Sequence, residues 1–139
     1  KVSAVVASVG TAGTIRGISD YVKGKNPDVK IVAVEPSADD KYLTGIHNFT
    51  DVPAERVPVN IREKIYDEVF VAEKDGAFAA AQEVAKTDGV LVGISSGAAL
   101  WGALQIASRP EYEGKEIVVV LPDTGLRYLS TDLFKAQKL

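Results

Sequence analysis

The segment Gly10–Thr14, with the sequence GTAGT, has the small and hydroxyl-bearing residues of a loop that binds a phosphate group. It follows a β-branched run that is typical of a buried strand and precedes a stretch with the pattern of a helix. The first N–H groups of a helix lack acceptors within the helix, and the helix dipole adds positive charge at that end. The hydroxyls of Thr11 and Thr14 would add two donors. The sequence therefore predicts a phosphate site, although a tight turn capped by threonine has the same pattern.

The spacing of the glycines does not decide which phosphate compound would bind. No Lys-Thr or Lys-Ser pair follows them, as a P-loop requires, and Gly10, Gly13 and Gly17 do not match G-x-G-x-x-G. Glu35 ends the next expected strand, where a dinucleotide-binding fold places the carboxylate that holds a ribose. Binding of NAD is therefore an alternative, although we expect Glu35 to be a solvated strand end beside Pro36.

Two further turns combine small and polar residues at the start of a helix or the end of a strand. The sequence GISSG begins at Gly93, and either Ser95 or Ser96 is its expected helix cap. The sequence LPDTG places Asp123 and Thr124 after the most apolar expected strand. Ligands of open α/β sheets bind beyond the carboxyl ends of the strands. We therefore expect these two turns and the GTAGT loop to face one crevice.

The composition is that of one ordinary globular domain. The 139 residues are 46% hydrophobic and 25% charged, with a formal net charge of −3. Because the basic residues form no stripe, we expect no nucleic-acid partner, and because no apolar run has membrane-spanning length, we expect no membrane contact. The chain has no cysteine, and His47 is its only histidine, so we expect no disulfide and no metal site. These features are compatible with a cytoplasmic protein.

The β-branched runs alternate with helical stretches, and most of them are continuously apolar. This pattern predicts right-handed βαβ units in a three-layer α/β fold, with a mostly parallel sheet and helices on both faces. The expected strands are Val2–Ala7, Lys30–Val34, Glu68–Ala72, Gly89–Val92 and Ile117–Leu121. The expected helices are Gly13–Lys23, Asp75–Asp88 with Asp75 as its N-cap, Ser96–Ala107, and one that follows Thr131.

The segment 36–66 interrupts this alternation. It has no sustained hydrophobic period, and it contains Pro36, Pro53, Pro58 and Gly45. A connection of this length inside a compact domain usually serves a function or an interface. The alternative is a surface excursion with short helical turns. We assign 1–139 to a single domain in which 36–66 is irregular.

Four segments, taken in order, resemble the cysteine synthase family. These O-acetylserine sulfhydrylases, with cystathionine β-synthase as a close relative, are pyridoxal-phosphate (PLP) enzymes of fold type II. The segments are VGTAGTIRGISDYVKGKNPDVKIVAVEP, YDEVFVA, GVLVGISSGAALWGAL and IVVVLPDTGLRYLST. The resemblance implies that the chain is the larger, phosphate-binding domain of such an enzyme and the C-terminal part of a longer protein.

The resemblance also assigns roles to particular positions. The family's phosphate loop, GTGGT, falls on Gly10, Thr11, Ala12, Gly13 and Thr14. The hydroxyl that the family directs at the pyridine nitrogen falls on Thr124, with Asp123 as the alternative. The glycine segment that faces the substrate falls on Gly45, Ile46 and His47. Alanine in the loop is tolerated only where φ is negative, so we expect a negative φ at Ala12.

The family's reaction is a β-replacement, which implies synthesis of cysteine from an O-activated serine, such as O-acetylserine, and sulfide. A cystathionine β-synthase-like enzyme and a non-catalytic NAD-binding module are the alternatives. The family's Schiff-base lysine lies in an upstream half without a counterpart here, so we expect no catalytic lysine in this chain and no activity from it alone. The resemblance further implies a homodimer that binds serine acetyltransferase. His47 and Asn48 replace small residues of the family and leave the identity of the amino-acid substrate open.

Overall fold

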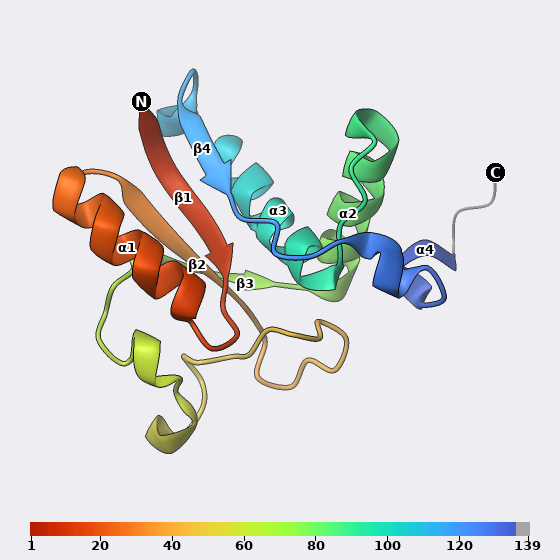
Figure 1. Ribbon diagram of the computed structural model, residues 1–139, viewed down its shortest axis with the longest axis horizontal. Coiled ribbons are helices and arrows are strands. Elements are labelled where there is room, and N and C mark those ends of the chain that lie inside the picture. The colour runs from red at the N-terminus through yellow and green to blue at the C-terminus, as the bar shows by residue number, and fades with distance from the viewer. Residues whose placement is uncertain (136–139) are drawn as a thin grey trace.

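A computed structural model describes residues 1–135, and Figure 1 shows their arrangement. The strands are β1 (Val2–Ser8), β2 (Lys30–Pro36), β3 (Glu68–Ala72) and β4 (Glu116–Val119). The α-helices are α1 (Gly13–Lys25), α2 (Lys74–Asp88), α3 (Ile94–Ala107) and α4 (Asp132–Lys135). Short 3₁₀ turns are η1 (Ala54–Arg56), η2 (Val59–Ile61), η3 (Pro110–Tyr112) and η4 (Gly125–Tyr128).

The four strands form one parallel sheet in the order β3-β2-β1-β4. In the centre of the sheet, Val6 of β1 pairs with Val32 of β2 on one side and with Val119 of β4 on the other. The chain crosses from β1 to β2 through α1 and from β3 to β4 through α2 and α3. The predicted parallel α/β fold is thus confirmed.

The two faces of the sheet are covered by different helices, which makes three layers (Figure 1). On one face, Val5 and Ala7 of β1 pack in a cluster with Ile15 of α1. On the opposite face, Val6 and Val34 pack in a second cluster with residues of α2 and α3. Adjacent residues of β1 therefore serve opposite cores, as the alternation of side chains along a strand requires. No helix within residues 1–135 is both long and apolar enough to cross a membrane.

Three local expectations are wrong. Gly89–Val92 is not a strand. Gly89 ends α2 in the left-handed conformation, and the Val90 N–H donates to the carbonyl of Val84 in that helix. Of these four residues, Val92 alone forms a bridge, with Thr124. The helix α2 starts one residue before Asp75, and its N-cap is Glu73. The N-cap of α3 is Gly93, so Ser95 and Ser96 lie inside the first turn.

Candidate functional site

A cavity of about 290 Å³ lies beyond the carboxyl end of β1 and brings the three turns together. Its lining consists of Ser8, Gly10, Thr11, Ala12, Gly13, Thr14, Gly45, Ile46, Ser95 and Pro122. All five residues of the GTAGT loop therefore face the cavity, together with two residues of the segment between β2 and β3. His47, Asp123 and Thr124 are not part of this lining.

The loop has the backbone conformation of an anion-binding site. Ala12, the N-cap of α1, has φ 64° and ψ 12°, in the left-handed region, so the expectation of a negative φ at this alanine is wrong. A left-handed residue beside a right-handed one turns successive N–H groups toward one side, which creates a concavity that binds anions. The N-cap of α1 is Ala12, which has no capping side chain, so neither threonine is the N-cap that the alternative requires.

The donors of the loop are of the kind that binds a phosphate. The first N–H groups of α1 have no acceptor within the helix, and Arg16 N–H is the first that reaches back, to the Ala12 carbonyl at 3.0 Å. The Thr11 hydroxyl oxygen accepts from Gly13 N–H at 3.5 Å, which holds this side chain beside the first turn of α1. Holding a non-glycine residue in the left-handed region costs roughly 1–2 kcal/mol, so the surrounding contacts must maintain this conformation.

The opposite wall of the cavity, Gly45 and Ile46, lies against the loop through close backbone contact. A Cβ atom added to Gly10 would lie 2.8 Å from the Gly45 carbonyl oxygen, so glycine is required at Gly10 for this approach. The N–H of His47 donates to the carbonyl of Val9 at 2.8 Å. These contacts place the wall directly beside the residue that precedes the loop.

Glu35 fixes the same wall from the end of β2. Its carboxylate is fully buried, and its Oε2 accepts from the N–H groups of Phe49 at 2.7 Å and Thr50 at 3.2 Å. The Thr50 hydroxyl donates to Oε1. The expectation of a solvated strand end is therefore wrong, and both oxygens of the group on which NAD binding would depend already have protein donors. Glu35 holds the irregular segment against the sheet.

The third turn is held together by Asp123 and Ser96. The Ser96 hydroxyl donates to Asp123 Oδ1 at 2.8 Å, and a Cβ on Gly93 would overlap the Asp123 carboxylate. The pKa of Tyr128 is raised, mainly by burial and to a smaller extent by its hydrogen bond with this carboxylate. The Thr124 hydroxyl oxygen accepts from Leu126 N–H at 3.3 Å. Asp123 is thus engaged within the protein, and Thr124 caps the turn η4.

Ser95 is the hydroxyl that sequence reasoning did not assign to the site. It lies in the first turn of α3 and lines the cavity, whereas the neighbouring Ser96 is fully buried against Asp123. The two adjacent serines of GISSG point in different directions, because residues one apart on a helix face different sides. The GISSG pattern at the start of a helix was the available signal. Pro122, after β4, was also missed.

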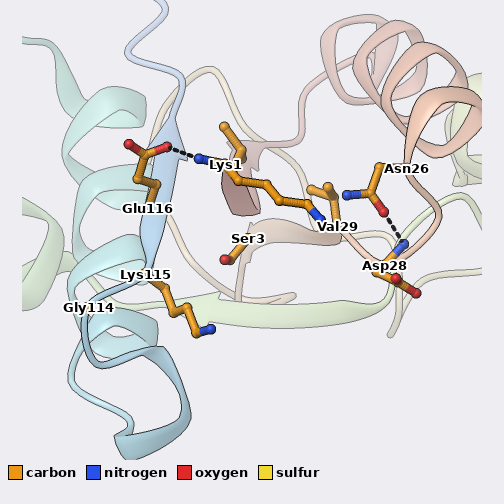
Figure 2. Close-up of a pocket in the computed structure, with 9 residues that line it drawn as sticks. Lys1, Ser3, Asn26, Asp28, Val29, Gly114, Lys115 and Glu116 are labelled. Atoms are coloured by element: carbon orange, nitrogen blue, oxygen red, sulfur yellow. Dashed lines mark hydrogen bonds and ion pairs between the residues drawn. The ribbon is translucent and has the colours of Figure 1, made fainter.

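Residues 1–135 offer no lysine in the lining of the cavity and no cluster of three or more His, Asp or Glu side chains for a metal. A larger hollow lies at the opposite end of the sheet, beside the amino ends of β1 and β4 (Figure 2). There the Glu116 carboxylate accepts from the α-amino group of Lys1, not from its side chain, at 3.0 Å. Because parallel sheets bind ligands at their carboxyl ends, the cavity at the GTAGT loop is the candidate site.

The chain belongs to the family of pyridoxal-phosphate dependent enzymes, whose pattern matches residues 1–123. This confirms the resemblance and makes PLP the cofactor of the family. Cysteine synthase from Staphylococcus aureus is 39% identical over 136 residues, which are 96% of this chain and 44% of that protein. The chain therefore spans less than half the length of the curated relatives that it matches.

Similar solved structures include O-acetylserine sulfhydrylases and a related enzyme. O-acetyl serine sulfhydrylase isoform 3 from Entamoeba histolytica is 39% identical with a TM-score of 0.82, over 99% of this chain and 42% of that one. O-acetylserine dependent cystathionine beta-synthase from Helicobacter pylori is 28% identical with a TM-score of 0.84, over 96% and 44% of the two chains. The loop suits the phosphate of PLP, since the first N–H groups of α1 lack acceptors within the helix and Thr11 and Thr14 add hydroxyls.

Proposed function

We propose that this chain forms the phosphate-binding part of a PLP-dependent enzyme that makes cysteine from an O-activated serine, such as O-acetylserine, and sulfide. The observation that carries the proposal is the single cavity in which the GTAGT loop, Gly45, Ile46 and Ser95 meet. Its position at the carboxyl end of a parallel sheet agrees with a ligand site. The similarity to cysteine synthases and O-acetylserine sulfhydrylases supports the reaction.

The role of the loop is to hold the cofactor's phosphate. Gly10, Gly13 and the left-handed Ala12 let the backbone approach, while Thr11 and Thr14 supply hydroxyls. When bound, PLP supplies an electron-withdrawing ring for elimination and replacement at the β-carbon of an amino acid. The phosphate grip fixes where that ring lies relative to the chain.

A neutral hydroxyl directed at the pyridine nitrogen would leave the nitrogen largely unprotonated and favour β-replacement. The family resemblance assigns the contact with the pyridine nitrogen to the Thr124 hydroxyl, with the side chain of Asp123 as the alternative. The lining of the cavity supports Ser95 as a better candidate than either, since neither Asp123 nor Thr124 reaches it. We therefore propose Ser95 for the ring and Asp123 for support of the turn.

On the substrate side, we propose that Gly45 and Ile46 form the wall that faces the amino acid. His47 shares an adjoining hollow with Ile46 and with the exposed Arg56. This arrangement supports an effect of His47 on substrate choice from beside the cavity.

The lysine that binds the cofactor covalently is proposed to lie outside these 139 residues. No lysine lines the cavity in the described part of the chain, which supports this proposal. The chain by itself would then bind PLP reversibly and lack turnover. Borohydride reduction in the presence of PLP tests this. Exposed lysines react weakly and without preference, so a stoichiometric adduct on one lysine of this chain alone would contradict the proposal.

A cystathionine β-synthase-like activity is the second candidate, favoured by the similarity to the Helicobacter pylori enzyme. The two candidates share the cofactor and differ in the thiol that adds. Binding of NAD has no comparable support, because the Glu35 carboxylate is buried and occupied. Family resemblance alone supports a cytoplasmic homodimer that binds serine acetyltransferase, and we retain these as proposals.

The decisive experiment uses the protein that contains this chain, reconstituted with PLP. We expect visible absorbance from bound cofactor, and formation of cysteine from O-acetylserine and sulfide. Homocysteine in place of sulfide separates the second candidate. Absence of cofactor absorbance would contradict the proposal, as would selective binding of NAD.

A further inference from the structure

Asn60 makes a polar contact with the phosphate loop that the proposed function does not use. Its side-chain amide, Nδ2, donates to the carbonyl of Thr11 at 3.1 Å, across 49 positions of sequence. Asn60 lies in the middle of η2, and it is not among the residues that line the cavity. It therefore approaches the loop from outside the cavity.

This contact acts on the peptide between Thr11 and Ala12. In a trans peptide the C=O and the N–H point in opposite directions. A donor that holds the Thr11 carbonyl on the outer side therefore keeps the Ala12 N–H on the side away from Asn60. Thr11 and Ala12 both line the cavity, whereas Asn60 does not, so the side away from Asn60 is where a phosphate would lie.

The peptide needs such a hold because Ala12 is the one non-glycine residue with positive φ in the described chain, at φ 64°. An alanine left to itself prefers negative φ, and the change from one region to the other rotates the preceding peptide. Rotation would turn the Thr11 carbonyl toward the cavity, where its oxygen would repel a phosphate. The hydrogen bond from Asn60 opposes this rotation.

Asn60 is itself held in place by its neighbour. Ile61 is 3% exposed and packs in the same core cluster as Ala12 and Ile15 of α1. The N–H of Ile61 also donates to the Pro58 carbonyl at 3.0 Å. The turn η2 is thus anchored beside the loop, and its amide group has a defined position relative to Thr11.

We propose that Asn60 is a positioning residue of the cofactor site: it holds the Thr11–Ala12 peptide so that the Ala12 N–H donates to the phosphate of PLP. This inference rests on the proposed function of the loop. It predicts a specific energetic coupling between Asn60 and Ala12, because glycine at position 12 would adopt the left-handed conformation without help.

The test is a double-mutant cycle in the protein that contains this chain. The affinity of the cofactor-free protein for PLP is measured by titration for Asn60→Ala, Ala12→Gly and the double variant. We expect Asn60→Ala to weaken binding about three- to tenfold, as loss of one hydrogen bond allows, but less than about twofold in the Ala12→Gly background. Asn60→Asp, which has the same size and no donor, should weaken binding at least as much.

Asn26→Ala is the matched control. Asn26 accepts from the Asp28 N–H at 3.1 Å at the far end of α1, and its replacement should leave PLP affinity unchanged. Equal losses from Asn60→Ala in both backgrounds would overturn the proposal, because they would mean general support of the segment. No loss in either background would also overturn it.

A second readout separates this proposal from the function on which it rests. Without PLP, the ¹³C chemical shifts of Ala12 report its φ, and we expect Asn60→Ala to move them toward values for negative φ. Unchanged shifts would overturn the hold by Asn60. Failure of the parent protein to bind PLP would instead overturn the proposed function, and the shifts of Ala12 would still test Asn60.

Discussion

The GTAGT loop and the segment between β2 and β3 form opposite walls of one cavity, yet different interactions hold them. The loop, Gly10–Thr14, takes its position from the strand before it and the helix after it. The segment takes its position from distant hydrogen bonds, chiefly those that Phe49 and Thr50 make to Glu35. One wall thus depends mainly on local structure, with Asn60 as a distant contact, and the other depends on buried polar anchors.

Removal of the main anchor of the segment should have the largest effect. Glu35→Ala would leave the buried N–H of Phe49 and the partly buried N–H of Thr50 without this acceptor. We expect a loss of about 3 kcal/mol in the free energy of unfolding, measured with urea. Glu63→Ala is the control, since this side chain is 78% exposed and forms a surface ion pair with Arg16, and it should change stability by less than about 0.5 kcal/mol. Similar losses from both variants would contradict a buried anchor.

The second prediction concerns the contact between the two walls. In Gly10→Ala the new methyl group would lie 2.8 Å from the Gly45 carbonyl, so one backbone must move. We expect PLP affinity to fall about tenfold to a hundredfold, as measured by titration of the cofactor-free protein. Gly17→Ala is the matched control, because a Cβ there meets nothing within 4 Å. Unchanged affinity in Gly10→Ala would show that the walls can separate without cost.

The hydroxyls of Ser95, which lines the cavity, and of Thr124, which does not, should differ in their effect on the cofactor. Ser95→Ala should weaken PLP binding about fivefold and alter the absorption spectrum of the bound cofactor, because it removes a hydroxyl that lines the site. Thr124→Ala is the counterpart, and we expect it to leave the spectrum unchanged. The reverse result would assign the ring contact to Thr124, as the family resemblance does.

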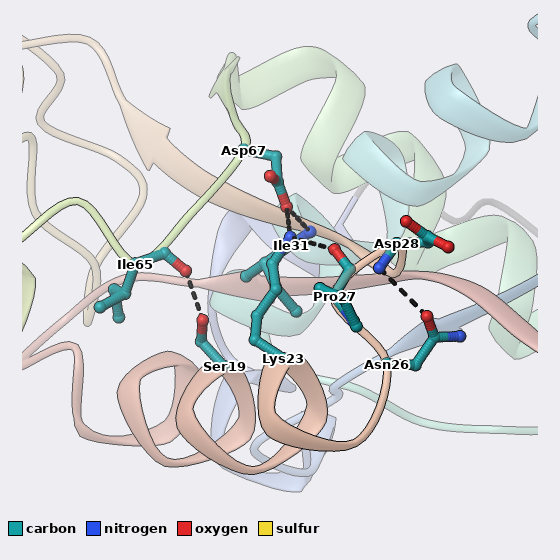
Figure 3. A network of polar contacts seen from close by, with 8 residues as sticks. All are labelled: Ser19, Lys23, Asn26, Pro27, Asp28, Ile31, Ile65 and Asp67. Carbon is teal, nitrogen blue, oxygen red and sulfur yellow. Dashed lines mark hydrogen bonds and ion pairs between the residues drawn. The ribbon is translucent and has the colours of Figure 1, made fainter.

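The smallest effect is expected where the segment rejoins the sheet (Figure 3). Asp67 accepts from Ile31 N–H at 2.7 Å and pairs with Lys23 at 2.6 Å. Burial acts to raise the pKa of Asp67, but these hydrogen bonds and the charge of Lys23 outweigh burial and lower it. Because the pKa of Asp67 is lower in the folded protein, its carboxylate stabilises the fold at pH values above the ordinary pKa of 3.8. This stabilisation is lost as the pH falls below 3.8 toward the lowered pKa.

Asp67→Asn tests this sign. We expect the variant to be less stable than the parent by about 1 kcal/mol at neutral pH, and the difference to shrink as the pH falls below about 4. Urea unfolding as a function of pH measures both quantities. A difference that stays constant down to acid pH would contradict the role of the charged carboxylate.

The frame of the molecule was predictable because its determinants are local. The strand β3 has the expected bounds, and β1 extends only one residue further than expected, to Ser8. The prediction failed at Gly89–Val92, where the apolar run is short and the end of α2 uses the Val90 N–H. A periodic pattern cannot show that a helix cap competes with a strand for the same backbone group.

The site was predictable to the same extent. The GTAGT loop follows from a strand-to-helix turn, and the resemblance added Gly45 and Ile46. The left-handed Ala12 was not predictable, since alanine has no local preference for that region. The contacts of Glu35 and Asn60 join residues 14 and 49 positions away, and no local pattern indicates such partners.

The anchoring of the segment at separate points has a consequence for how this fold can diversify. Glu35 holds Phe49, Asn60 holds Thr11, and Asp67 holds the return to the sheet. The stretches between these anchors can change in length wherever they do not contact the loop, as Gly45 does, because closing a longer loop costs little extra entropy. Insertions there could add new side chains beside the cavity while the GTAGT loop keeps its geometry. On the proposed function, substrate preference could then change with little effect on cofactor binding.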